Sequence, residues 1–85
     1  MLRELLIREH LNKMENVKIT TEYIKLDQLL KFAGIAENGA MAKEMILDGI
    51  VSVNNEVCTM RGKKLRPGDR VCVDFEDELC EINVE

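Results

Sequence analysis

The hydrophobic period of this chain changes at Gly49, and this change restricts the fold more than any other feature. Before Gly49, Leu26 and Leu29 begin a pattern at the spacing of an α-helix. After it, Val51 and Val53 alternate with a polar residue, which is the period of a half-buried strand. Because 85 residues, 46% of them hydrophobic, suffice for one modest core, both kinds of element must share it. The sequence therefore predicts a single α+β domain.

Two short amphipathic helices are expected before the change of period. The first covers residues 26–33, and the second runs from Asn38, a suitable N-cap, to about Asp48, with Gly49 as its terminator. This pair predicts a helical hairpin, which we expect to pack on a small, mainly antiparallel sheet. Leu47 falls outside the apolar face of the second helix, so it either covers a neighbouring strand or is exposed for a partner. That apolar face consists of Met41, Ala42, Met45 and Ile46.

Turn residues delimit the strands. Asn54 and Asn55 tolerate the positive φ angles of a tight hairpin turn, and the Pro67-Gly68-Asp69 sequence marks another turn. Residues 17–20 are a further candidate for an edge strand ahead of the first helix. Two later strands are expected to place alternate residues on one face, namely Val71, Val73 and Phe75 in the first and Cys80, Ile82 and Val84 in the second.

Residues 1–16 are treated as an N-terminal extension, and residues 17–85 as the domain. The apolar residues of the extension are scattered around a helical wheel, which predicts a poorly amphipathic helix at best. Two interpretations are open. Either the extension packs loosely on the domain as a helix, or translation starts at Met14 and the residues before it are not native.

The charge of the chain is unevenly distributed. Residues 71–85 hold six acids and no cation, so residues 1–70 carry a net charge of +2 although the whole chain carries −4. Arg61, Lys63, Lys64 and Arg66 form the one dense basic cluster, without an intervening carboxylate. A cluster this short is either a solvated loop or part of a surface that binds an anionic partner.

Several functional classes have little support in the sequence. No apolar run approaches the roughly 18 residues of a membrane span, so we expect a cytoplasmic protein with no membrane partner. Cys58, Cys72 and Cys80 lack metal-ligand or disulfide spacing and are expected to be small packing residues. His10 is the one histidine, and no nucleophile has a recognisable base partner. We therefore expect no enzyme, cofactor, metal or small-molecule substrate.

The segment from residue 24 to about 75 resembles a known family. Its marks are Leu26-Asp27 at a helix start, Ala42-Lys43 in the second helix, the passage G-I-V-S-V-N-N-E that begins at Gly49, and the Pro67-Gly68-Asp69 turn. Together they resemble the RNA-binding domain named after the fourth protein of the small ribosomal subunit, also called the alpha-L motif. The free-standing size resembles the YaaA and YbcJ group of small bacterial proteins.

The resemblance implies a non-catalytic protein that binds structured RNA, either ribosomal RNA or tRNA, through a basic face of the helical hairpin and the following loop. The ribosome and ribosome-associated proteins are further expected partners. The cations that match this face are Lys25, Lys31, Lys43, Arg61, Lys63, Lys64 and Arg66. Because phosphate contacts carry little sequence information, recognition is expected to depend on RNA shape. Stacking is expected to be minor, since Phe32 and Phe75 occupy expected core positions.

One position departs from the family pattern. Where many members begin the second helix with Ser-Arg, this chain has Asn38 and Gly39, so a main RNA-contacting cation is missing. We expect a phosphate site there instead, because Gly39 leaves the amides of Gly39, Ala40 and Met41 open at the positive end of the helix. The alternative is that Gly39 only permits close packing of the loop.

A second function remains open. The strands and the G-D-R-V sequence also resemble sulfur-carrier β-grasp proteins, but this chain ends in Asn83-Val84-Glu85 rather than Gly-Gly. We therefore expect no thiocarboxylate chemistry, whereas a protein-docking role without RNA contact remains open. A related alternative is an accessory domain that binds ribosomal proteins through Leu47 and the acidic strands.

Overall fold

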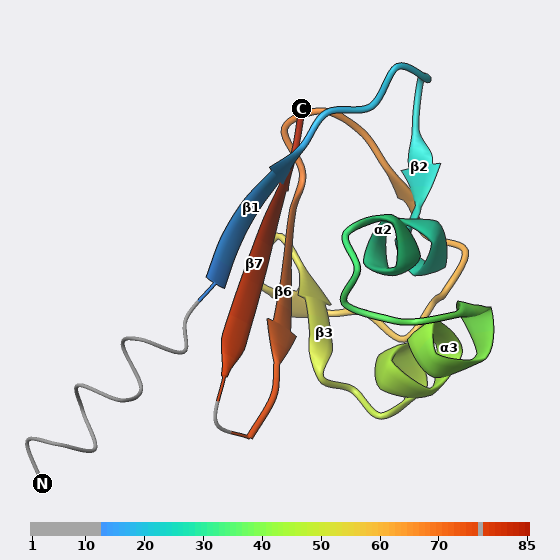
Figure 1. Cartoon of the computed structure of the whole chain (residues 1–85), viewed down its shortest axis with the longest axis vertical. Coiled ribbons are helices and arrows are strands. Elements are labelled where there is room, and N and C mark those ends of the chain that lie inside the picture. The colour runs from blue at the N-terminus through green and yellow to red at the C-terminus, as the bar shows by residue number, and fades with distance from the viewer. Residues whose placement is uncertain (1–12, 77) are drawn as a thin grey trace, which may run out of the picture.

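The computed structural model of the chain describes residues 13–76 and 78–85 as two helices and two sheets. The elements are β1 (Lys13–Val17), β2 (Ile24–Lys25), α2 (Leu26–Phe32), α3 (Gly39–Leu47), β3 (Val51–Val53), β4 (Glu56–Val57), β5 (Lys64–Leu65), β6 (Arg70–Asp74) and β7 (Leu79–Val84). Both helices lie on one side of a five-stranded sheet with the order β1-β7-β6-β3-β4 (Figure 1), and β2 pairs with β5 separately. The predicted α+β class is confirmed.

Local signals define the ends of the helices as the sequence predicts. The side-chain oxygen of Asn38 accepts a hydrogen bond from the Met41 amide at 2.9 Å, which satisfies an otherwise free donor of α3. Gly49 follows the last residues of α3 with a φ of 79°, the left-handed conformation in which glycine ends a helix. Neither helix in the described part of the chain has the length and apolar character needed to cross a membrane.

The core lies between the helices and one face of the large sheet. In the antiparallel register, Val51 faces Val73 and Val71 faces Ile82, so alternate residues of three strands reach the same side. Cys80, Ile82 and Val84 share one face of β7, as predicted, and all three are buried. The largest fully buried side chains are Leu26, Leu29, Leu30, Ile46, Leu65, Ile82, Val51, Val71 and Val73.

The sheet is mixed, because β1 runs parallel to β7 while β7, β6, β3 and β4 pair antiparallel in turn. Residues 13–16, which were expected to precede the domain, pair with Cys80–Asn83 in this strand. The amide of Ile19 then donates to the carbonyl of Glu85 at 2.9 Å and continues the pairing. The expectations for residues 1–12, including His10, lie outside the described residues.

Two apolar residues are not where the sequence predicts them. Phe32 was expected in the core but is 69% exposed, because it lies at the end of α2 and outside the stripe formed by the buried leucines. Leu47 is 59% exposed, so the interpretation that it covers a neighbouring strand is wrong. Met41 is also partly exposed, whereas Ala42, Met45 and Ile46 are buried as predicted.

The two predicted turns are joined by a polar network. Asn54 and Asn55 adopt φ angles of 50° and 72°, which confirms the expected hairpin turn. The carboxylate of Asp69 accepts hydrogen bonds from the Arg66 amide at 2.8 Å and from the side chain of Asn54 at 3.1 Å. These two bonds hold the pKa of Asp69 below its ordinary value, and the nearby cations Lys63 and Arg66 add to the effect. The network fixes the end of the basic cluster against the β3–β4 turn.

Replacing Asp69 with alanine is expected to lower the free energy of unfolding at neutral pH by about 1–2 kcal/mol, because both donors lose a charged acceptor. The folded-state pKa of Asp69 lies below the unfolded value, so its contribution is complete above pH of about 4 and is lost as the pH falls through the lowered pKa. Urea unfolding at pH 7 and pH 3 should therefore show a gap between wild type and Asp69→Ala that narrows in acid. An equal difference in unfolding free energy at both pH values would contradict the stabilising role of the Asp69 carboxylate. The control is Asp48→Ala, which removes an exposed carboxylate.

Candidate nucleic-acid interface

The basic cluster is attached to the start of α2. The first amides of a helix have no partner within the helix, and here the Leu26 amide donates to the Lys63 carbonyl at 2.8 Å, while the Asp27 amide donates to the Arg61 carbonyl at 3.1 Å. Leu65, between two cations, is completely buried. The backbone of the cluster is therefore held by main-chain bonds and one apolar anchor, while its charged side chains remain exposed.

The pairing of β2 with β5 brings like charges together. Lys25 lies directly opposite Lys64 in this two-stranded sheet, an arrangement that destabilises a strand pair in the absence of an anion. The Nζ atom of Lys64 lies 4.8 Å from the centre of the Tyr23 ring, and the guanidinium carbon of Arg66 lies 6.0 Å from the same centre. Tyr23 thus positions two cations of the cluster through cation–π contacts.

Tyr23 was not among the predicted site residues. Its position shortly before the first helix carries no local signal, because Lys64 and Arg66 are distant in sequence and meet it only through the β2–β5 pairing. An alternation of aromatic and basic residues within one segment would have been detectable, but here the two kinds of residue come from different segments.

The cations of the cluster are not neutralised by direct ion pairs. Across residues 13–76 and 78–85, the ion pairs join Lys13 to Glu78 and Arg70 to Glu81, and none includes a predicted interface residue. The carboxylate of Asp27, two residues after Lys25, accepts a hydrogen bond from the Gln28 amide instead. The structure thus presents exposed positive charge around the start of α2.

The remaining predicted residues lie outside this contact network. Lys31 is exposed in the last turn of α2, at the opposite end from the basic cluster, and Lys43 is exposed within α3. At the start of α3, the space around the Cα of Gly39 is open, with no atom within 4 Å of a Cβ placed there. The interpretation that Gly39 permits close loop packing is therefore wrong.

The prediction that three main-chain amides are open to a phosphate at the start of α3 needs one correction. The Met41 amide donates to Asn38 and is not free, so the open amides at this helix start are those of Gly39 and Ala40. The helix carries no acid in its first turn. The local charge is thus compatible with a bound anion. The site offers two free amide donors in place of the three that the sequence predicts.

A hollow of about 350 Å³ lies beside the basic cluster. It is lined by Lys63 together with the exposed apolar residues Val57 and Met60, and Glu56 is at its margin. The cluster therefore borders a concave surface with both a cation and apolar groups. No group of three or more metal-ligand side chains occurs in the described part of the chain, and burial raises the pKa of the Cys72 thiol, which keeps it protonated at neutral pH.

Known proteins match most of this chain. The family model for the S4 domain matches residues 17–83, a range that includes both helices and every predicted interface residue. The probable ribosome maturation protein RlbA of Bacillus subtilis (strain 168) is 41% identical over 58 residues, which cover 68% of this chain and 82% of that protein.

Proposed function

This chain belongs to the S4 domain family, and from that premise we propose that it is a non-catalytic protein that binds structured RNA. The helices α2 and α3 and the basic cluster that follows them would form the contact surface. The similarity to a protein named for ribosome maturation supports ribosomal RNA as the first candidate and the ribosome or its assembling subunits as the place of action. Transfer RNA is the second candidate ligand.

The observation that carries this proposal is the grouping of three cations, in which Lys64 and Arg66 lie over the Tyr23 ring and Lys25 lies opposite Lys64. Lysines placed opposite each other cost folding free energy, and neither lysine takes part in an ion pair with a carboxylate among the described residues. A phosphate group between them would remove the repulsion and release counterions from the RNA, which is the main source of affinity in such contacts. Function therefore explains an arrangement that folding alone disfavours.

The geometry favours recognition of RNA shape. Phosphate contacts position a protein without reading sequence, and two cations lie against Tyr23, which limits the access of a base to that ring. Phe32 is the exception, because its exposed ring next to Lys31 is available to an unpaired base. Duplexes or junctions with a nearby unpaired nucleotide fit this surface best.

Binding to ribosomal RNA fragments and to tRNA over a range of salt concentrations tests the proposal. Affinity should fall steeply with salt, by a slope of about 0.9 for each phosphate contact. Absence of binding at low salt would favour the second candidate, a protein-docking module without RNA contact. The exposed Leu47 is the observation that supports that candidate.

The start of α3 supplies a separate test of the interface. Gly39→Asp is expected to weaken RNA binding by about three- to tenfold, because a carboxylate would repel a phosphate at the Gly39 and Ala40 amides. The fold should tolerate it, since the site is open and an acid suits the first turn of a helix. Gly39→Ala is the matched control and should bind nearly as wild type. Unchanged affinity of the aspartate variant would remove this phosphate site.

A further inference from the structure

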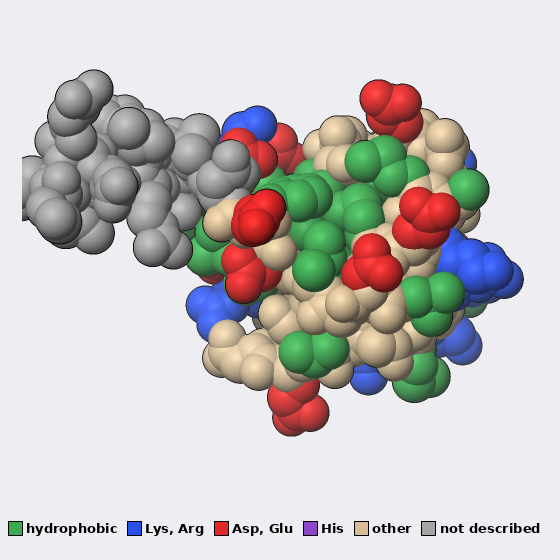
Figure 2. Space-filling model, turned by 90° about the horizontal axis from the view of Figure 1, so that it is seen from below, with side chains coloured by type: hydrophobic (Ala, Val, Ile, Leu, Met, Phe, Trp, Pro, Cys, Tyr) green, Lys and Arg blue, Asp and Glu red, His purple; other side chains and the backbone are tan. Residues whose placement is uncertain are grey.

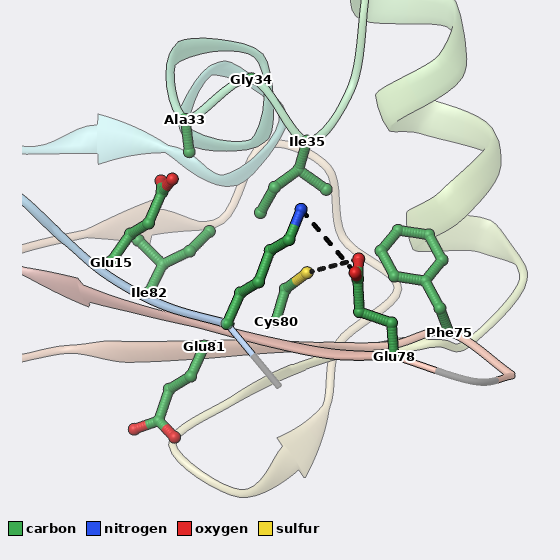
Figure 3. A pocket seen from close by; sticks show the side chains of 10 residues that line it. Glu15, Ala33, Gly34, Ile35, Phe75, Glu78, Cys80, Glu81 and Ile82 are labelled. Atoms are coloured by element: carbon green, nitrogen blue, oxygen red, sulfur yellow. Dashed lines mark hydrogen bonds and ion pairs between the residues drawn. The ribbon is translucent and has the colours of Figure 1, made fainter. Parts of the chain in front are cut away.

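A second surface lies away from the basic cluster, where the sheet extends past the end of α2. A cavity of about 240 Å³ opens there, with apolar walls from Ala33, Ile35, Phe75 and Ile82. Figure 3 shows Ile35 above Cys80, with Phe75 at one end of the opening. Seen from this end of the molecule, hydrophobic side chains gather in the centre of the face with acidic side chains around them (Figure 2).

Strand β1 supplies charged groups to the apolar side of the sheet. Its register pairs Lys13 with Cys80 and Glu15 with Ile82, so both side chains lie on the face that buries Val17. Glu15 is directed toward Ala33 across the cavity (Figure 3). Its carboxylate takes part in no ion pair and no hydrogen bond within residues 13–76 and 78–85. Among the described residues, the apolar cavity is therefore lined by one unpaired carboxylate.

The cavity already accepts a cation from its own chain. The Nζ atom of Lys13 lies 3.7 Å from Oε2 of Glu78, and Oε1 of the same carboxylate accepts the thiol hydrogen of Cys80 at 3.5 Å. Burial and the neighbouring Glu78 raise the pKa of the Cys80 thiol, so at neutral pH it is uncharged and contributes to the apolar floor. Lys13 balances Glu78, whereas the carboxylate of Glu15 has no partner among the described residues.

We propose that this cavity binds an arginine or lysine side chain from a basic segment of a partner protein. The methylene groups of such a side chain would contact Ile35 and Ile82, and its charged end would reach Glu15. The ring of Phe75 offers a further contact to a guanidinium. Glu15, Glu78 and Glu81 line the cavity with one cation, Lys13, and this excess of negative charge attracts a segment with several cations, so the occupant is a basic protein rather than RNA.

The volume of the cavity is large enough for one long side chain but too small for a helix or a strand. The acids of this face also act against RNA, because a phosphate backbone would be repelled where a basic peptide is attracted. The protein would therefore hold RNA at the start of α2 and a basic protein at the far end of the sheet. The docking site does not depend on the proposed RNA binding.

Fluorescence anisotropy of a labelled hexa-arginine peptide with the purified full chain, without RNA, tests this site. Glu15→Lys should weaken binding by about tenfold, because it removes the free carboxylate and adds a competing cation. Glu44→Lys makes the same change in net charge on exposed α3 and should change affinity less than about twofold. Lys13→Ala should strengthen binding, because an internal competitor is removed.

The outcomes separate a specific site from general attraction. Equal losses in Glu15→Lys and Glu44→Lys would overturn the proposal, as would absence of binding to the wild-type protein at low salt. Glu15→Gln, which keeps the shape of the side chain, replaces Glu15→Lys if thermal melting shows that the lysine variant is unfolded. Since no RNA is present, a failure here is distinct from a failure of RNA binding.

Discussion

Changing Lys63 and Lys64 together to glutamate is expected to abolish most RNA binding, with affinity reduced by at least about 30-fold at ~0.1 M salt. Two phosphate contacts would be lost and two repulsive charges added where the backbone of the cluster is held firmly to α2. The slope of the logarithm of affinity against the logarithm of salt concentration should become shallower by about 2. Filter binding or anisotropy with a ribosomal RNA fragment measures both quantities.

The matched control for this double variant is Lys13→Glu with Lys18→Glu. It changes net charge by the same amount on exposed lysines of β1 and the segment after it. If both double variants lose equal affinity, binding depends on total charge and the basic cluster is not the contact surface. Because Lys63 and Lys64 are exposed, their substitution should leave the domain folded.

Leu65→Ala is expected to cost about 2–5 kcal/mol of unfolding free energy, the usual result of truncating a fully buried leucine. This is a large fraction of the stability of a domain of this size, and it corresponds to a fall in melting temperature of about 10–25 °C. Leu65 lies between Lys64 and Arg66 and is completely buried, so the substitution should also loosen the interface. Urea unfolding and RNA binding measured on the same variant test both effects.

Val57→Ala is the control for the loss of apolar volume. Val57 lies in the short edge strand β4 and is 66% exposed, so its truncation should cost less than about 1 kcal/mol. A cost for Leu65→Ala as small as that of Val57→Ala would show that Leu65 does not anchor the basic cluster. A large loss of stability with unchanged RNA affinity would separate the anchor from the binding surface.

The features that could be predicted from the sequence are those set by neighbouring residues. Asn38 caps the helix that follows it, Gly49 ends that helix, and Asn54 and Asn55 form the turn. Each depends on the conformational preferences of a few consecutive residues and on hydrogen bonds within one turn of the chain. The same holds for the two hydrophobic periods, which indicated the helices, the strands and the α+β class.

The candidate site could be predicted only in part. The residues of the basic cluster follow from their density in the sequence, but the role of Tyr23 and the opposition of Lys25 and Lys64 depend on the β2–β5 pairing. Such contacts join residues that are distant in sequence, and no local pattern records which strand will be the neighbour. The charged lining of the cavity beside β1 likewise could not be predicted without the register of β1. The sequence places Glu15 in an extension and not beside Ile82.

The exposure of individual side chains also depends partly on local sequence and partly on the tertiary structure. A helical wheel identifies which face of α3 is apolar and places Leu47 outside it, but whether another element covers Leu47 depends on the positions of all other elements. The sequence predicts Phe32 in the core, but the short α2 directs it away from the leucine stripe, and it is exposed. Local propensities and periodicity thus specified the elements and their ends. Strand order, the parallel β1–β7 pairing and the residues grouped at the two proposed binding surfaces arose from long-range packing, because burial is a property of the assembled chain.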